Sequence, residues 1–164
     1  MEVDESNGKY TYIKGTAKKG VSEAFLFSTG KLGLDVTDKF FAPADNWLKA
    51  DANGNFERYS NHWHFTATSD KQNTYRFATI INTHAKVQEG EKPALKPTVR
   101  KDGTIKMGAW IIKVNLSADG KPFFHVYNNK EGEDVSVKYE GEETIVREDG
   151  YETKLKDNVP ELEI

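Results

Sequence analysis

The chain has 164 residues, a net charge of −3, 37% hydrophobic, 30% charged and 12% aromatic residues, and no cysteine. This length fits one domain, and the aromatic content argues against disorder because each aromatic side chain buries a large area. The absence of thiols excludes disulfides, thiolate metal sites and cysteine nucleophiles, and no run approaches the roughly 20 apolar residues of a membrane-spanning helix.

Period-2 alternation of apolar and polar residues predicts strands along most of the chain. Residues 1–8 are polar and are expected to be a linker at the cut end of a longer chain. A first strand is predicted around residues 10–13. Residues 23–28 and 31–36 flank Thr29 and Gly30, a pair typical of a tight turn, and therefore predict a hairpin.

A second hairpin is predicted from residues 61–68 and 74–81, which are joined by the polar loop 70–73. The apolar faces of these two strands are predicted to be Trp63, Phe65 and Ala67, and Tyr75, Phe77, Thr79 and Ile81. Between the two hairpins, residues 39–60 are irregular, and residues 43–53 contain the signals for one helical turn.

The second half of the chain repeats the strand pattern. Its hairpin-turn signals are Asp102-Gly103, Asp119-Gly120 and Asp149-Gly150. Its predicted strands are 106–116, 122–127, 134–139, 144–148 and 151–156. About ten short strands at regular spacing predict an all-β fold, an antiparallel β-sandwich formed as a single domain over residues 1–164. A barrel would produce the same pattern.

Two histidines, His62 and His64, are separated by one residue on a predicted strand and therefore project from the same face. Such a pair suits two metal ligands, but a site needs a third ligand, for which His84 and Glu57 are candidates. The alternative is a pair of histidines on the polar face, opposite Trp63 in the core. We expect no metal and no other cofactor.

Aromatic residues in the same region are candidates for carbohydrate contacts. Trp47 and Tyr59 lie in the long irregular segment, where an exposed ring can stack on a sugar. The alternative for Trp47 is a buried loop anchor. Together with His62 and His64, these two residues form the predicted substrate-binding set. No nucleophile elbow or phosphate loop is present, so no catalytic residue is assigned.

Charge is unevenly distributed along the chain. Residues 131–164 hold twelve acidic and four basic residues, whereas residues 1–130 hold fourteen acidic and nineteen basic ones. No basic stripe with interleaved aromatics is present, so nucleic acid is not expected as a partner. The positive first part could favour an anionic polymer, or the charges could form an ordinary solvated surface with an acidic tail.

Three strings of sequence resemble one family. Residues 40–47 contain Phe40-Phe41-Ala42-Pro43 and Asn46-Trp47, residues 61–67 read Asn-His-Trp-His-Phe-Thr-Ala, and residues 75–81 read Tyr-Arg-Phe-Ala-Thr-Ile-Ile. Together they resemble the C-terminal β region of heparinase II/III-like polysaccharide lyases of Bacteroidetes, over about residues 23–82.

The resemblance implies a non-catalytic, C-terminal accessory domain of a lyase that cleaves uronic-acid polysaccharides. It also implies upstream catalytic domains in the same chain, an acidic polysaccharide as ligand, and a periplasmic or secreted location. None of the family's catalytic motifs matches a position here, so lyase activity would belong to the parent chain. The alternatives are an independent carbohydrate-binding module and a purely structural or interaction domain.

Overall fold

The computed structural model describes residues 1–39, 52–53, 63–86, 95–128, 130, 135–140 and 143–155, and the backbone of Trp47–Ala50, Phe56–Arg58 and Lys156. These residues form fifteen strands and no helix, which confirms the predicted all-β fold. The count exceeds the predicted ten because several strands have only two to four residues. The chain divides into two compact units, Gly30–Asn73 and the combination of Glu2–Thr29 with Thr74–Ile164. The single domain predicted over residues 1–164 stays a prediction.

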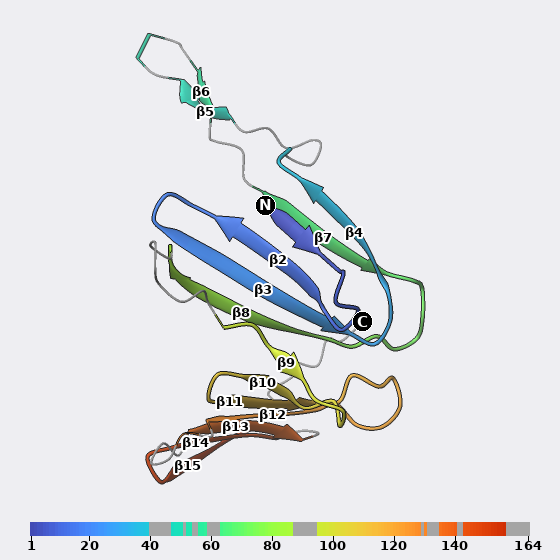
Figure 1. The fold of residues 1–164 in the computed structure, drawn as a ribbon. Helices are drawn as coiled ribbons and strands as arrows, with labels where there is room; N and C mark the ends of the chain where they lie inside the picture. The colour runs from blue at the N-terminus through green and yellow to red at the C-terminus, as the bar shows by residue number, and fades with distance from the viewer. Residues whose placement is uncertain are drawn as a thin grey trace, which may run out of the picture. The chain divides into compact units, whose positions relative to one another are not determined.

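The larger unit contains a four-stranded antiparallel sheet (Figure 1). Its strands are, in spatial order, β1 (Glu2–Asp4), β2 (Thr11–Thr16), β3 (Gly20–Ser28) and β8 (Phe77–Ala85). β1 lies within residues 1–8, the segment predicted as a linker, and pairs with β2. In the register, Phe25 stands opposite both Tyr12 and Ile80, so these three side chains share one face of the sheet.

A seven-stranded sheet follows in the same unit, and each of its strands pairs with the next along the chain. The strands are β9 (Thr98–Val99), β10 (Ile105–Met107), β11 (Trp110–Val114), β12 (Phe123–Asn128), β13 (Ser136–Glu140), β14 (Glu143–Glu148) and β15 (Tyr151–Lys156). Asp149 and Gly150 link the last two strands with φ of 50° and 80°. Positive φ at both positions is the geometry of a type I′ turn, as the Asp-Gly pair predicted.

The core of the larger unit forms where these two sheets meet. Tyr12, Phe25 and Phe27 of the first sheet are buried with Ile105 of the second, and Ile112 and Val114 pack against them. The ring centroids of Tyr12 and Phe25 lie 5.3 Å apart. Packing two antiparallel sheets over a shared aromatic core is the arrangement of a sandwich, so the predicted sandwich-like fold is confirmed.

The smaller unit contains two short antiparallel pairs. β4 (Leu32–Thr37) pairs with β7 (His64–Ser69), and β5 (Trp47–Ala50) pairs with β6 (Phe56–Arg58). Both predicted hairpins of the first half are therefore wrong. β3 pairs with β2 and β8, whereas β4 and β7 pair with each other. The helical turn predicted within residues 43–53 is also wrong over Trp47–Ala50, which form a strand.

The inward face of β8 differs from the prediction. Phe77 and Ile81, predicted to face the core, are each 68% exposed, whereas Ile80 packs against the core. The reason is that β8 carries apolar residues on both faces, so alternation alone does not show which face is buried. Pairing with β3 makes the selection, because Ile80 stands opposite the buried Phe25.

Trp63 also departs from its predicted core position. It precedes β7 and its side chain is 54% exposed. The strand that it introduces pairs with β4 in a two-stranded sheet, and a sheet of that size offers little cover to a large ring.

Candidate functional site

One face of the seven-stranded sheet gathers basic side chains into a line that crosses the strands. In the register, Lys113 of β11 stands opposite His125 of β12, and His125 stands opposite Lys138 of β13. The line continues through Ile145 of β14 to Lys154 of β15. Directly paired residues project from the same face of a sheet, and neighbouring strands lie about 4.8 Å apart. We call Lys113, His125, Lys138 and Lys154 the basic row.

The adjacent line on the same face adds an aromatic ring and another cation. Tyr127 lies two residues after His125, and their ring centroids are 4.8 Å apart. The Lys113 Nζ atom lies 5.9 Å from the centroid of the Tyr127 ring. Arg147 of β14 projects from the same face and is exposed. The face therefore combines a flat ring with several ammonium and guanidinium groups.

Carboxylates neutralise only part of this charge. Glu140 pairs with Lys138 at 2.6 Å, and Glu152 pairs with Arg147 at 2.7 Å and with Lys154 at 3.9 Å. Among the described side chains of this face, the cations are Lys106, Lys113, Lys138, Arg147 and Lys154, and the carboxylates are Glu140, Glu143 and Glu152. The face is positive although the whole chain is negative.

The pKa of His125 is consistent with an excess of positive charge on this face. Burial lowers this pKa below its ordinary value of 6.5, and the charges of Lys113, Lys138 and Arg147 lower it further. All three named charges are positive, so cations dominate the potential at this ring.

Like charges directly opposite each other on neighbouring strands destabilise a sheet. Lys113, His125 and Lys138 occupy directly opposed positions on three successive strands, so a protonated His125 would face a lysine on either side. A local pattern that works against folding is expected where a binding function requires it. The basic row is therefore the strongest candidate functional site among the described residues.

A second polar cluster lies inside the four-stranded sheet. Glu23 is 5% exposed and Tyr12 9% exposed. The Tyr12 hydroxyl donates a hydrogen bond to Glu23 Oε1, and the His84 Nε2 atom lies 3.2 Å from Glu23 Oε2. The His84 Nδ1 atom lies 2.6 Å from the carbonyl oxygen of Ala85. The three side chains thus use their polar atoms on internal partners, as expected for a structural cluster.

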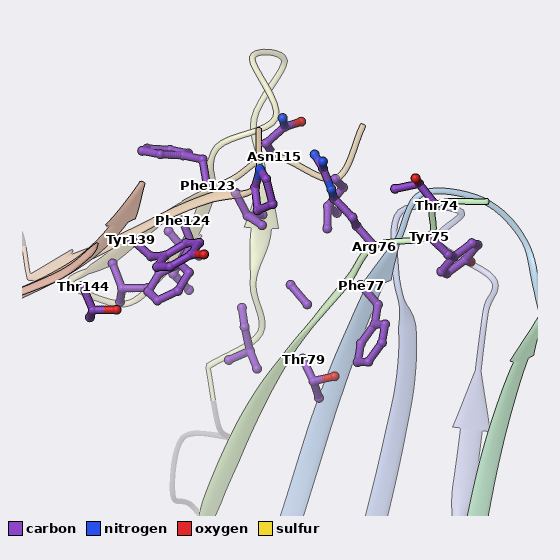
Figure 2. A pocket seen from close by; sticks show the side chains of 17 residues that line it. Thr74, Tyr75, Arg76, Phe77, Thr79, Asn115, Phe123, Phe124, Tyr139 and Thr144 are labelled. Atoms are coloured by element: carbon purple, nitrogen blue, oxygen red, sulfur yellow. The ribbon is translucent and has the colours of Figure 1, made fainter. Parts of the chain in front are cut away.

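An apolar hollow of about 1060 Å³ lies between β8 and strands β11–β14 (Figure 2). Phe124 and Tyr139 stack at its wall with ring centroids 5.7 Å apart. Arg76 is also part of its lining, but the guanidinium donates hydrogen bonds to the carbonyl oxygens of Ser117 at 2.6 Å and Gly120 at 2.7 Å. Arg76 therefore holds the loop between β11 and β12.

The residues predicted from the sequence lie elsewhere. His64 begins β7 in the smaller unit, is half-buried and stands opposite Thr37. Trp47 begins β5, but only its backbone is described, and Tyr59 and His62 lie outside the described residues. The structure therefore leaves the predicted binding set as a prediction, since His64 is the one member whose side chain it describes. Alternation within each strand of the second half indicates which residues share a face. It does not show that Lys113, His125 and Lys138 are aligned, because their alignment depends on the register between strands.

Metal and membrane features were searched over the same described residues. They contain no group of three or more His, Asp or Glu side chains placed to hold a metal ion. His84, one suggested third ligand, is engaged by the Glu23 carboxylate. No helix long and apolar enough to cross a membrane occurs in this part of the chain.

Comparison with known proteins gives no assignment: no family model matches the sequence, and no curated protein matches it.

Proposed function

We propose that this chain is a non-catalytic module that binds an acidic polysaccharide across the seven-stranded sheet. The observation that carries the proposal is the register that sets Lys113, His125 and Lys138 directly opposite one another on three neighbouring strands. Three basic groups in one line match a ligand whose negative charges also repeat along a line. A polymer of uronic acids or sulfated sugars has this property.

The glycan would run across the strands, roughly perpendicular to them. Its carboxylates would accept hydrogen bonds from the ammonium groups of Lys113, Lys138 and Lys154, which makes the bonds charge-assisted. Tyr127 offers an apolar surface beside this line for the face of a sugar ring. The positive field of the face would also increase the rate at which an anionic polymer is captured. These groups bind and orient a ligand, and the proposal gives none of them a catalytic step.

The wider context is part of the same proposal. The resemblance to heparinase II/III-like lyases supports an accessory role beside upstream catalytic domains that cleave uronic-acid polysaccharides, in a periplasmic or secreted protein. In that setting, the basic row would hold the anionic substrate close to the catalytic domain. Trp47, Tyr59, His62 and His64 stay a separate predicted set of carbohydrate contacts, within the smaller unit.

The test is a calorimetric titration with uronic-acid oligosaccharides and with a neutral glucan of equal length. The double variant Lys113→Gln, Lys138→Gln should weaken the binding of the acidic ligand by about one to two orders of magnitude, because it removes two charged contacts. The matched control is Lys9→Gln, Lys18→Gln, which changes the net charge equally at exposed positions in the loops that join β1 to β2 and β2 to β3. This control should bind as the wild type does.

Three outcomes would contradict the proposal. Equal weakening of binding by both double variants would indicate nonspecific electrostatic attraction. Equal affinity for the neutral glucan would show that binding does not depend on the charge of the glycan. Absence of binding to any acidic glycan would instead favour a structural or interaction domain.

A further inference from the structure

His125 is the member of the basic row whose charge changes near neutral pH. It lies between Lys113 on β11 and Lys138 on β13, with Arg147 of β14 and Tyr127 of its own strand on the same face. The carboxylates nearest to these cations are Glu140, which pairs with Lys138, and Glu152, which pairs with Arg147. Cations therefore flank the imidazole on both neighbouring strands.

This position opposes protonation of the free protein. Partial burial disfavours the charged ring, and a proton on His125 would add a third positive charge between two lysines. Both effects lower the pKa of His125 below 6.5. At neutral pH the free ring is therefore neutral and contributes little to attracting an anion.

A bound polyanion reverses the second effect. A carboxylate or sulfate seated on Lys113 and Lys138 also lies beside His125, since the three residues are adjacent in one row. An opposite charge within about 4–6 Å raises the pKa of a histidine by roughly one or more units. We propose that an acidic glycan bound on the basic row takes up one proton at His125, so that the protein binds its ligand more tightly in mildly acidic surroundings. This inference rests on the proposed function and adds its regulation.

The direction of the pH effect follows from linkage. If the complex binds more protons than the free protein, affinity rises as the pH falls. The rise begins as the pH drops through the pKa of His125 in the complex, and it ends below the lower pKa of the free protein. The carboxylates of uronic acids titrate well below this range and stay negative across it.

The experiment measures affinity for a uronic-acid oligosaccharide between about pH 7.5 and about pH 5.5. We expect the wild-type affinity to rise by roughly three- to tenfold over this range, whereas His125→Gln should show an almost flat profile. Calorimetry in two buffers with different ionisation enthalpies should show proton uptake by the wild type only. The Lys9→Gln, Lys18→Gln variant should keep the wild-type pH profile. Circular dichroism confirms that each variant is folded.

A second measurement needs only the wild-type chain. The imidazole resonances of His125, followed by NMR against pH, should give a higher pKa with the glycan than without it. An unchanged pKa, or parallel affinity profiles for wild type and His125→Gln, would overturn this inference and leave the proposed function standing. Failure of the wild type to bind at about pH 5.5 would overturn both.

Discussion

The cluster of Tyr12, Glu23 and His84 shows how one buried carboxylate contacts side chains of two neighbouring strands. Both ring nitrogens of His84 face oxygen atoms, at Glu23 and at the Ala85 carbonyl. Glu23 accepts a hydrogen bond from the Tyr12 hydroxyl at Oε1 and lies beside His84 Nε2 at Oε2, so one carboxylate serves both side chains. Its charge alone would assign Glu23 to solvent, although alternation places it on the same face as the buried Phe25, because both of its partners lie on other strands.

We expect Glu23→Leu to lower the free energy of unfolding by about 2 kcal/mol, because it leaves the buried Tyr12 hydroxyl without an acceptor and removes the partner of the half-buried His84 ring. Glu23→Gln should cost less, since its amide can accept from Tyr12 and donate to the Nε2 atom of a neutral imidazole. Urea denaturation of the two variants measures the difference. A Leu variant as stable as the wild type would show that the cluster does not stabilise the fold.

Among the strands, β8 illustrates how pairing determines which face is buried. Ile80 and Ile81 are neighbours in sequence, but Ile80 packs against the core opposite Phe25 and Ile81 is exposed. On β11, Ile112 packs against the core because it stands opposite the buried Ile105, while its neighbour Ile111 is buried on the other face of the strand.

The two isoleucines form a matched pair for a stability measurement. Ile80→Ala should lower the free energy of unfolding by roughly 1–2 kcal/mol, because it removes methyl groups of a half-buried side chain that pack against the core. Ile81→Ala should change it by less than about 0.5 kcal/mol, as expected for an exposed position. Chemical denaturation of both variants is the measurement. The reverse order would mean that the opposite face of β8 is buried.

Across the whole molecule, the net charge conceals where the positive charge lies. The chain is negative, and residues 131–164 carry a large acidic excess, yet Lys138, Arg147 and Lys154 of that segment contribute to the basic face. Attraction between this face and an anionic polymer would be screened by salt.

The proposed binding therefore predicts a marked salt dependence. Raising NaCl from about 50 mM to about 200 mM should weaken binding of a uronic-acid polymer by roughly tenfold, as counterions compete for about three contacts. The Lys113→Gln, Lys138→Gln variant should show a smaller slope of log affinity against log salt concentration, and Lys9→Gln, Lys18→Gln the wild-type slope. Fluorescence anisotropy with a labelled oligosaccharide measures these slopes. Binding that does not change with salt would contradict the basic row as the site.

The all-β class of this protein and most strands of its second half are determined by the local sequence. Alternation and Asp-Gly turns predicted strands β12 to β15, because a meander pairs each strand with its neighbour and its turns are encoded where they occur. The single strand predicted over residues 106–116 was wrong: a turn with Gly108 at a φ of 61° divides it into β10 and β11, which pair with each other. The all-β class follows from the same local signals.

Only the tertiary structure decided the remainder. In the first half, β3 pairs with β8 and β4 with β7 across long stretches of chain, and no local signal reports such distant partners. The candidate site depends on register in the same way. Lys113, His125, Lys138 and Lys154 lie on four strands and become one surface only when pairing aligns them, because a shift of one residue would turn each side chain to the opposite face.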